Sequence, residues 1–340
     1  MLLDLYPMLK PLLFKIDAEK THTRTMSMLQ KMPYIIPRTV IEDPVTVMGI
    51  SFPNRLGLAA GLDKNGVAVP AFDRMGFGFV EVGTATPKPQ PGNAKPRMFR
   101  IPEYEAVINR MGFNNNGINS LVNEVAAIKH NVRAVIGINV GKNTATSNEN
   151  AAKDYKYCIE TATRYADYIT INISSPNSPG IRDLFGKEYL SDLLFAVKMT
   201  QRQCEQRDGK YTPLVVKLSP DSTEDELDTI LDCIKEQNID GIIASNSTVN
   251  KAEIADSPMS EERGGLSGAP LRYRALDMIR IVRSRLPDIP LIASGGVMSA
   301  QDYLDRLEAG ADLVQVFTGL IYRGPQLVND CLKSRVPLRG

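Results

Sequence analysis

Eight short apolar runs, each followed by polar or glycine residues, alternate along this chain of 340 residues with stretches of helical spacing. Strand-like runs that are almost continuously apolar are typical of parallel sheets covered on both faces. Eight such units in one chain of this length favour an α/β fold that closes into a (β/α)8 or TIM barrel. The runs occupy 55–61, 77–84, 133–140, 167–174, 213–219, 241–246, 290–296 and 313–319, and helical spacing occupies 117–130, 150–165, 187–207, 223–236, 271–285 and 299–309.

The residues that end each run are the candidates for a functional site, because active sites of these barrels lie at the carboxyl ends of the strands. The fourth run ends in NISSPNSPG, residues 172–180. Here Asn172, Ser175 and Asn177 offer amide and hydroxyl groups on a backbone that two prolines stiffen. We interpret the segment as a binding loop, and the alternative is an ordinary solvated Ser/Asn/Pro loop.

Two lysines stand near strand ends. Lys217 lies inside the apolar run VVKLS, where removing an ammonium group from water is costly unless it meets an anion or a reacting group. We therefore predict a functional role for Lys217 over an outward-facing structural one. Lys64 follows the first run, in AAGLDKNG, and is either a solvated loop lysine or a mobile cation for a substrate carboxylate.

Glycine marks the ends of the last two runs, SGG at 294–296 and FTG at 317–319. The loops after strands seven and eight commonly bind phosphate in these barrels, since glycine lets backbone N–H groups approach an anionic oxygen. Thr318 adds a hydroxyl, and GGLSG at 264–268 adds a further flexible segment. Turns use glycine everywhere, but the three segments in this order predict a phosphate-bearing ligand.

A long segment, residues 85–132, separates the second and third runs and is expected to form a lid or a binding loop. It contains Asn109, which would join Asn172, Asn177 and Asn246 as a fourth primary amide around one cavity. Each amide carries a donor and an acceptor and can match the N–H and C=O edges of a pyrimidine or another cyclic imide.

Composition excludes several other classes of protein. The formal net charge of +1 offers no general attraction for nucleic acid, so no nucleic-acid partner is expected. The 4 cysteines form no CxxC pair and the 2 histidines stand away from strand ends, so no metal site is predicted. Cysteines this far apart are also consistent with a reducing compartment.

The first forty or so residues lie outside the repeating pattern and contain two helix-like stretches, the second at about 18–32. None of their apolar runs reaches the roughly 18–20 residues needed to span a bilayer, and no secretory signal is recognisable. Either the two helices form a cap that packs on the barrel, or they lie in a membrane interface with Lys10 and Lys15 near the headgroups.

Taken in order, the motifs AAGLDKNG, VGTATPKPQPGNAKPRMFR, INRMGFNNNG, GINVGKN, NISSPNSPG, VVKLSPD, ASNST, GGLSG, SGGV and LVQVFTGLIYRGP resemble class 2 dihydroorotate dehydrogenases, the membrane-associated, quinone-linked form. The resemblance covers essentially the whole chain from about residue 40. It implies an FMN-containing barrel, 41–340, that oxidises (S)-dihydroorotate to orotate in pyrimidine synthesis and reduces ubiquinone or menaquinone. It also implies that 1–40 form a helical membrane and quinone-access segment.

The family pattern assigns roles to individual residues of this sequence. Ser175 matches the catalytic base and Lys217 the residue that stabilises negative charge near the flavin. His22 and Arg100 match positions that line the quinone tunnel. FMN contacts are assigned to Ala60, Gly61, Leu62, Asp63, Lys64, Thr84, Asn139, Asn172, Lys217, Ser245, Gly268, Gly296, Phe317 and Thr318. Substrate contacts are assigned to Lys64, Asn109, Arg110, Met111, Gly112, Phe113, Asn172, Asn177, Asn246 and Ser247.

Two departures from the family pattern are visible. Phe317 stands where relatives usually carry tyrosine, so a hydroxyl near the flavin or quinone is absent, and Ser247 replaces a common threonine. The other functions weighed for this barrel are a Schiff-base aldolase with Lys217 as nucleophile, a flavin-dependent RNA-modifying reductase, and a non-catalytic flavoprotein. With the resemblance we expect a monomeric peripheral protein on the cytoplasmic side of a bacterial inner membrane.

Overall fold

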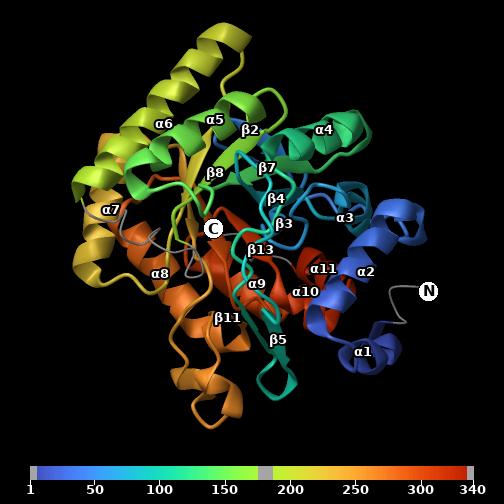
Figure 1. Cartoon of the computed structure of the whole chain (residues 1–340). Coiled ribbons are helices and arrows are strands. Elements are labelled where there is room, and N and C mark those ends of the chain that lie inside the picture. Colours follow the sequence, from blue (N-terminus) through green and yellow to red (C-terminus); the bar gives the residue numbers. More distant parts are fainter. Residues whose placement is uncertain (1–5, 175–186, 335–340) are drawn as a thin grey trace, which may run out of the picture.

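The centre of the molecule is a closed barrel of eight parallel strands in the order β3, β4, β7, β8, β9, β10, β12, β13. The computed structural model describes residues 6–174 and 187–334. Each barrel strand pairs with its neighbour in the chain order, as the alternating pattern predicts. The predicted (β/α)8 fold is therefore confirmed, and helices surround the barrel (Figure 1).

All eight predicted runs contain a barrel strand, and the six predicted helical stretches contain helices. The strands are β1 Val45–Val47, β2 Ile50–Phe52, β3 Leu56–Leu58, β4 Phe79–Ala85, β5 Met98–Ile101, β6 Ala106–Asn109, β7 Val135–Val140, β8 Tyr168–Asn172, β9 Leu214–Lys217, β10 Gly241–Ala244, β11 Gly265–Gly268, β12 Leu291–Ser294 and β13 Leu313–Val316. The helices are α1 Tyr6–Phe14, α2 Ala18–Lys31, α3 Val69–Met75, α4 Ile118–Ile128, α5 Ala151–Ala162, α6 Lys187–Asp208, α7 Glu224–Glu236, α8 Arg272–Arg285, α9 Ala300–Glu308, α10 Thr318–Arg323 and α11 Gln326–Lys333.

The segment expected to be a long loop, 85–132, is more ordered than its sequence suggests. It folds β5 and β6 into an antiparallel hairpin before it reaches α4. The glycine segment 264–268, expected to be flexible, is β11, which pairs antiparallel with β6. Proline and glycine in both segments hide this small sheet from strand patterns. Its strands extend away from the barrel in Figure 1.

A short hairpin, β1 and β2, covers the end of the barrel where the strands begin. Phe52 of β2 is fully buried and its ring meets the ring of Phe79 edge to face, with centroids 5.5 Å apart. The two residues belong to one buried cluster with inward-facing residues of the barrel strands, including Val135 and Tyr168. This packing fills the end of the barrel where the strands begin.

The two amino-terminal helices pack on the side of the barrel. In α1 the hydroxyl of Tyr6 donates to the carbonyl of Ile321 at 2.5 Å, and the Phe14 ring meets the Tyr322 ring. The helix α2 buries Met26 and Leu29. The division of the chain at about residue 40 follows this change of architecture and stays a prediction.

Candidate active site

A cavity opens at the carboxyl ends of the barrel strands, where the sequence predicts the site. It has about 1100 Å³ of empty space, counted out to its open mouth. The ends of β4, β8 and β9 and the loops after β3, β10, β12 and β13 contribute to its wall, and the β5–β6–β11 sheet lies over one side. Sites of small ligands are usually concavities of this kind, with a few convergent polar groups.

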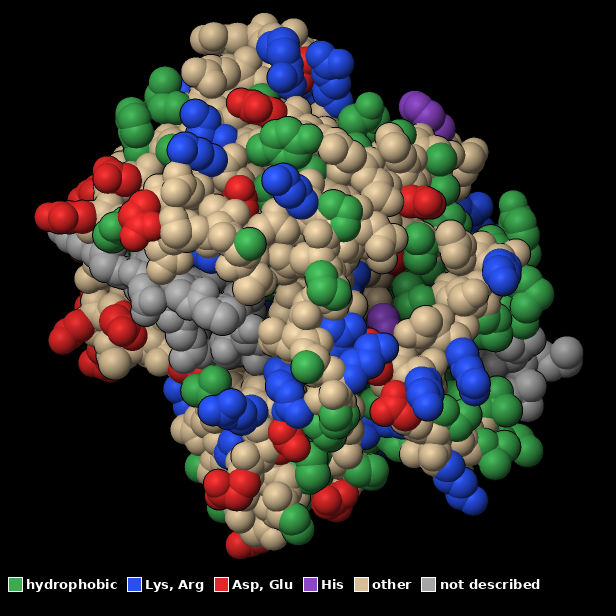
Figure 2. All heavy atoms as spheres, viewed as in Figure 1, with side chains coloured by type: hydrophobic (Ala, Val, Ile, Leu, Met, Phe, Trp, Pro, Cys, Tyr) green, Lys and Arg blue, Asp and Glu red, His purple; other side chains and the backbone are tan. Residues whose placement is uncertain are grey.

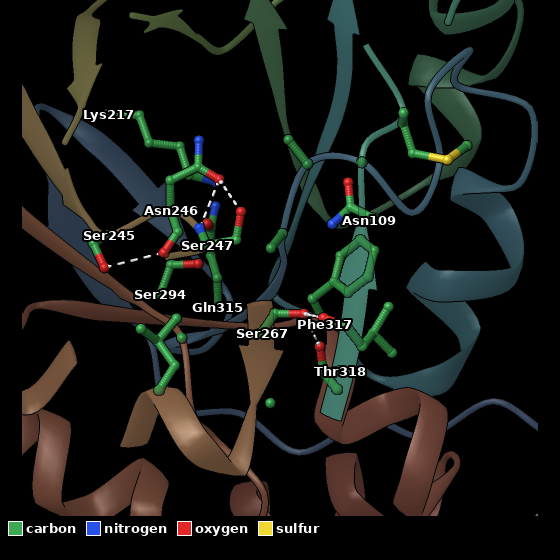
Figure 3. Close-up of a pocket in the computed structure, with 18 of the residues that line it drawn as sticks. Asn109, Lys217, Ser245, Asn246, Ser247, Ser267, Ser294, Gln315, Phe317 and Thr318 are labelled. Atoms are coloured by element: carbon green, nitrogen blue, oxygen red, sulfur yellow. Dashed lines mark hydrogen bonds between the residues drawn. The ribbon is translucent and has the colours of Figure 1, made fainter. Parts of the chain in front are cut away.

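The structure brings most of the predicted site residues together around this cavity. Figure 3 shows Lys217, Asn246 and Ser247 on one side of the space and Asn109 and Phe317 on the other. The predicted residues in the wall are Ala60, Gly61, Lys64, Thr84, Asn109, Met111, Gly112, Phe113, Asn172, Lys217, Ser245, Asn246, Ser247, Gly268, Gly296, Phe317 and Thr318. Ser175 and Asn177 lie outside the described residues.

Six other predicted residues lie behind the wall or away from it. Asn139 is fully buried one layer below the cavity. Leu62 and Asp63 are buried, and both carboxylate oxygens of Asp63 accept backbone N–H groups, from Val67 at 3.0 Å and Ala68 at 2.7 Å. Asp63 therefore holds the shape of the loop that carries Lys64.

Arg110, His22 and Arg100 point elsewhere. Arg110 pairs with Glu262 and donates to the carbonyls of Arg263 and Pro96. His22 of α2 approaches the carbonyl of Leu62, with 2.7 Å between its Nε2 and that oxygen. Arg100 donates to the carbonyl oxygens of Leu13 and Ile16 and lies over the Phe14 ring. Contacts of these three residues with substrate or quinone stay predictions.

Lys217 ends β9 with its side chain almost completely buried, 5% exposed, in the cavity floor. Burial lowers the pKa of its ammonium group, and the nearby carboxylate of Glu81 opposes this shift. Within the described residues, no oxygen accepts a hydrogen bond from its Nζ. A charged donor that is shielded from water and faces a cavity is suited to stabilise negative charge on a ligand.

Glu81 organises the amides around this lysine. It lies inside β4, fully buried, and accepts hydrogen bonds from Asn139 Nδ2 at 2.8 Å, Tyr168 Oη at 3.0 Å and Gln315 Nε2 at 2.8 Å. Asn139 Oδ1 in turn accepts from Asn172 Nδ2 at 3.2 Å. The carboxylate thus fixes the orientation of the Asn139 and Gln315 amides, and of these two only Gln315 lies in the cavity wall.

Sequence reasoning missed several residues in the wall and behind it. Gln315 is an uncharged polar residue inside the apolar run of β13, and Glu81 is a carboxylate inside the run of β4; this is the same signal that identified Lys217. The side-chain oxygen of Gln315 is buried and has no partner among the described residues, so it is free to accept from a ligand. Four further wall residues, Ser267, Ser294, Gly295 and Gly319, belong to the predicted glycine segments. The remaining wall residues are Ala59, Met98, Val107, Leu271, Val297 and Met298.

Glycine loops form the other end of the cavity. At Gly296 the backbone has φ +67°, and an ideal Cβ would lie 2.3 Å from the Cα of Arg272. The hydroxyl oxygens of Ser267 and Thr318 form a hydrogen bond of 2.8 Å beside these loops. Small residues and hydroxyls at the ends of β12 and β13 fit the phosphate of a nucleotide-like cofactor.

Two lysines, several amides and a glycine-lined end lie together in the mouth of an α/β barrel, an arrangement typical of an enzyme site. Comparison with known proteins makes this class specific. The family model described as dihydroorotate dehydrogenase matches residues 44–335, and the chain belongs to this family. Within the family it falls in class 2, the quinone-linked form.

The similar proteins span the whole chain. Dihydroorotate dehydrogenase (quinone) of Dichelobacter nodosus is 53% identical over 334 residues, which cover 98% of this chain and 99% of that protein. The protein of the same name from Chromobacterium violaceum is 46% identical, with 97% of each chain covered. The crystal structure of DHODH from Eimeria tenella in complex with ferulenol has a TM-score of 0.88 at 36% identity, covering 93% of this chain and 90% of that one.

Proposed function

We propose that the chain oxidises (S)-dihydroorotate to orotate, a step of pyrimidine synthesis, with FMN bound in the barrel mouth and a quinone as the final acceptor. The observation that carries the proposal is the convergence of Lys64, Asn109, Asn172, Asn246 and Lys217 on one cavity that ends in glycine loops. Membership of the quinone-linked family supports the same chemistry.

The residues present fit FMN. The glycine end, with Thr318, suits its phosphate, and the side-chain oxygen of Gln315 is a buried acceptor without a described partner. Bound FMN would supply the two-electron chemistry, by taking a hydride from the substrate and giving electrons to the quinone. Lys217 holds a positive charge at the cavity floor, where it stabilises the negative charge that develops in the reaction.

On the substrate side, the amides provide orientation and Lys64 provides charge. Asn246 Nδ2 donates to Ser174 Oγ at 3.0 Å, and Asn246 Oδ1 accepts from the Ser247 backbone at 2.8 Å, so this amide is held in one orientation. Lys64 Nζ donates to the Gly61 carbonyl at 2.5 Å, and this geometry leaves donors for a carboxylate. Ser175, assigned as the base by its motif, would take the proton from C5 as a hydride leaves C6.

The test is anaerobic reduction of the purified full-length protein. We expect a visible flavin band that dihydroorotate bleaches and a soluble quinone analogue restores.

Ser175→Ala should keep the band and lose most of the bleaching rate. Ser174→Ala is the matched control, because it removes the hydroxyl that contacts the Asn246 and Asn172 amides and should act mainly through KM. A bound flavin that dihydroorotate cannot reduce would contradict the proposal, and a protein without flavin that borohydride traps through Lys217 would favour an aldolase.

The helices α1 and α2 are proposed to attach the protein to the cytoplasmic face of a bacterial inner membrane as a monomer. Among the described residues, no helix is long and apolar enough to cross a membrane. Met8 is 73% exposed and Leu12 61%, while Lys15 and Lys20 are exposed nearby. Figure 2 shows hydrophobic side chains over these helices with basic side chains beside them. Such a surface suits a helix pair lying in a membrane interface.

Acidic substitutions test this attachment. Met8→Glu with Leu12→Glu should reduce co-flotation with anionic phospholipid vesicles and turnover with a long-chain quinone, while turnover with a water-soluble analogue is retained. Phe195→Glu, an equally drastic change at an exposed site on α6, serves as the control. Unchanged flotation of the double variant would contradict the proposed membrane surface.

A further inference from the structure

The glycine end of the cavity lacks a contacting charge. Only two cationic side chains, Lys64 and Lys217, occur in the described wall, and neither belongs to the loops after β12 and β13. The described wall residues of those loops, from 294 to 298 and from 317 to 319, are all uncharged. A phosphate group placed there would therefore meet N–H and hydroxyl donors but no ammonium or guanidinium group.

A buried arginine lies directly behind these loops. Arg306 of α9 is 0% exposed, and its Nη2 donates to the carbonyls of Gly295 and Arg272, both at 3.0 Å. Its Nη1 donates to the Asp302 carbonyl at 3.0 Å. An ideal Cβ built on Gly296 would lie 3.0 Å from Nη2, so the guanidinium group stands against the loop backbone itself.

These bonds have a consequence for the loop, because the C=O and N–H of one trans peptide point in opposite directions. The Gly295 carbonyl turns toward Arg306, away from the cavity wall. The N–H of Gly296, in the same peptide, is therefore turned to the other side, and no described residue accepts it. Arg306 thus fixes the peptide of a wall residue, Gly296, whose N–H has no described acceptor.

Arg306 and Arg272 bring two positive charges next to the loop, against the one buried carboxylate of Asp302. The buried carboxylate of Asp302 pairs with both arginines. Its Oδ1 lies 2.7 Å from Nε of Arg272 and 3.9 Å from Nη1 of Arg306. Burial lowers the pKa of Arg306 to about 10, so the group is still charged at neutral pH. The partly exposed Asp305 also acts on Arg306, but it accepts a hydrogen bond from Gln301 at the surface.

We propose that Arg306 is a positioning residue for the phosphate of the flavin cofactor. It supplies the missing positive charge through the thin glycine loop, without touching the ligand, and fixes the peptide that presents the Gly296 N–H. A glycine loop permits this arrangement because no side chain separates the guanidinium group from the cavity. The inference rests on the proposed function, since it takes FMN as the ligand.

The test compares FMN with riboflavin, which lacks the phosphate, on protein that has been reversibly depleted of flavin. Coulomb attraction across a buried loop acts only on the phosphorylated ligand. In Arg306→Met we expect at least tenfold weaker binding of FMN and less than threefold weaker binding of riboflavin. Arg306→Lys should keep the wild-type ratio of the two affinities within threefold, because it keeps the charge.

Arg283→Met is the matched control. Like Arg306, Arg283 donates hydrogen bonds to backbone carbonyl oxygens, in this case those of Gly310 and Ile289. These residues precede β12 and β13 and lie at the other end of the barrel. This variant should leave the affinity ratio unchanged. If Arg306→Met does not fold, Arg306→Gln replaces it, since its amide can still donate to Gly295.

The inference would be overturned if Arg306→Met kept the wild-type ratio of FMN affinity to riboflavin affinity, which includes equal weakening of both flavins. It would also be overturned if Arg306→Lys lowered this ratio as much as Arg306→Met does. Failure of the proposed function is recognised separately, because the wild-type protein would then bind no FMN or would bind FMN that dihydroorotate cannot reduce.

Discussion

Polar side chains inside the barrel strands are the residues that shape the site. Glu81, Lys217 and Gln315 all interrupt apolar runs, and all are buried. A carboxylate and an ammonium group inside one barrel offset each other's desolvation, which explains how both are tolerated there. Glu81 also accepts hydrogen bonds from the side-chain N–H groups of Asn139 and Gln315, so the side-chain oxygens of these amides are left for neighbours and ligand.

Lys64 gives the site a testable pH dependence. Burial and, to a smaller extent, the charge of Arg97 lower the pKa of its ammonium group to about 8, while Glu19 and Asp63 oppose the shift. His22 also faces Lys64, and its own pKa is lowered to about 4 by burial, so it is neutral in this range. Lys64 therefore carries its charge below about pH 8 and loses it as the pH rises.

We expect kcat/KM for dihydroorotate to fall as the pH is raised through about 8, because an uncharged amine no longer attracts the substrate carboxylate. The measurement is the pH profile of the reductive half-reaction. Lys64→Arg, which stays protonated, should move the fall to higher pH even if the maximum is lower. The same profile in both proteins would assign the titration to another group.

Among the secondary-structure elements, α2 and β5 form the joint between the amino-terminal helices and the site. Glu19 of α2 is 8% exposed and pairs with Arg97, with 2.8 Å from Nη2 to Oε1. Arg97 also donates to the carbonyls of Pro91 and Asn93, both at 2.7 Å, in the segment that leads to β5. The ion pair thus fastens the proposed quinone-access helices to the insertion that carries Asn109.

Glu19→Gln should lower the free energy of unfolding by roughly 3 kcal/mol at neutral pH, because it leaves the Arg97 guanidinium buried without its counter-charge. Arg97 lowers the pKa of Glu19, so this stabilisation is present above the ordinary pKa of a glutamate and is lost in acid. Denaturant unfolding measures the change. Asp43→Asn, which breaks a more exposed pair with Arg55, should cost less than about 1 kcal/mol; equal losses would refute a special role for Glu19.

Across the whole molecule, stability and function occupy opposite ends of the barrel. The β1–β2 hairpin fills the end where the strands begin, and the cavity occupies the end where they finish. This division follows from the fold, because parallel strands present all their carboxyl ends on one face.

Phe52→Ala should therefore reduce stability without changing cofactor binding. Removal of a fully buried phenylalanine leaves a cavity and is expected to cost about 3–5 kcal/mol. Unfolding followed by circular dichroism gives the loss, and the flavin band gives occupancy of the site. Phe195→Ala, at a side chain that is 56% exposed, should change stability by about 0.5 kcal/mol or less. Loss of flavin from folded Phe52→Ala protein would contradict the division.

The sequence alone determined the barrel and the place of its site. Apolar runs and helical spacing are local properties, set by burial on two faces of a strand or one face of a helix, so all eight strands could be located. The residues that end those runs had to share one face, and Lys64, Asn109, Asn172, Asn246 and Lys217 do meet there.

Tertiary structure decided the contacts between segments that are distant in the chain. Pairing of 265–268 with 106–109, the Glu19–Arg97 ion pair and the position of Arg306 behind Gly295 have no local pattern. Glu81 and Gln315 were visible as polar residues in apolar runs, but their partners were not. The physical reason is that periodicity records which face of an element is buried, whereas the choice of partner depends on how the closed barrel brings those faces together.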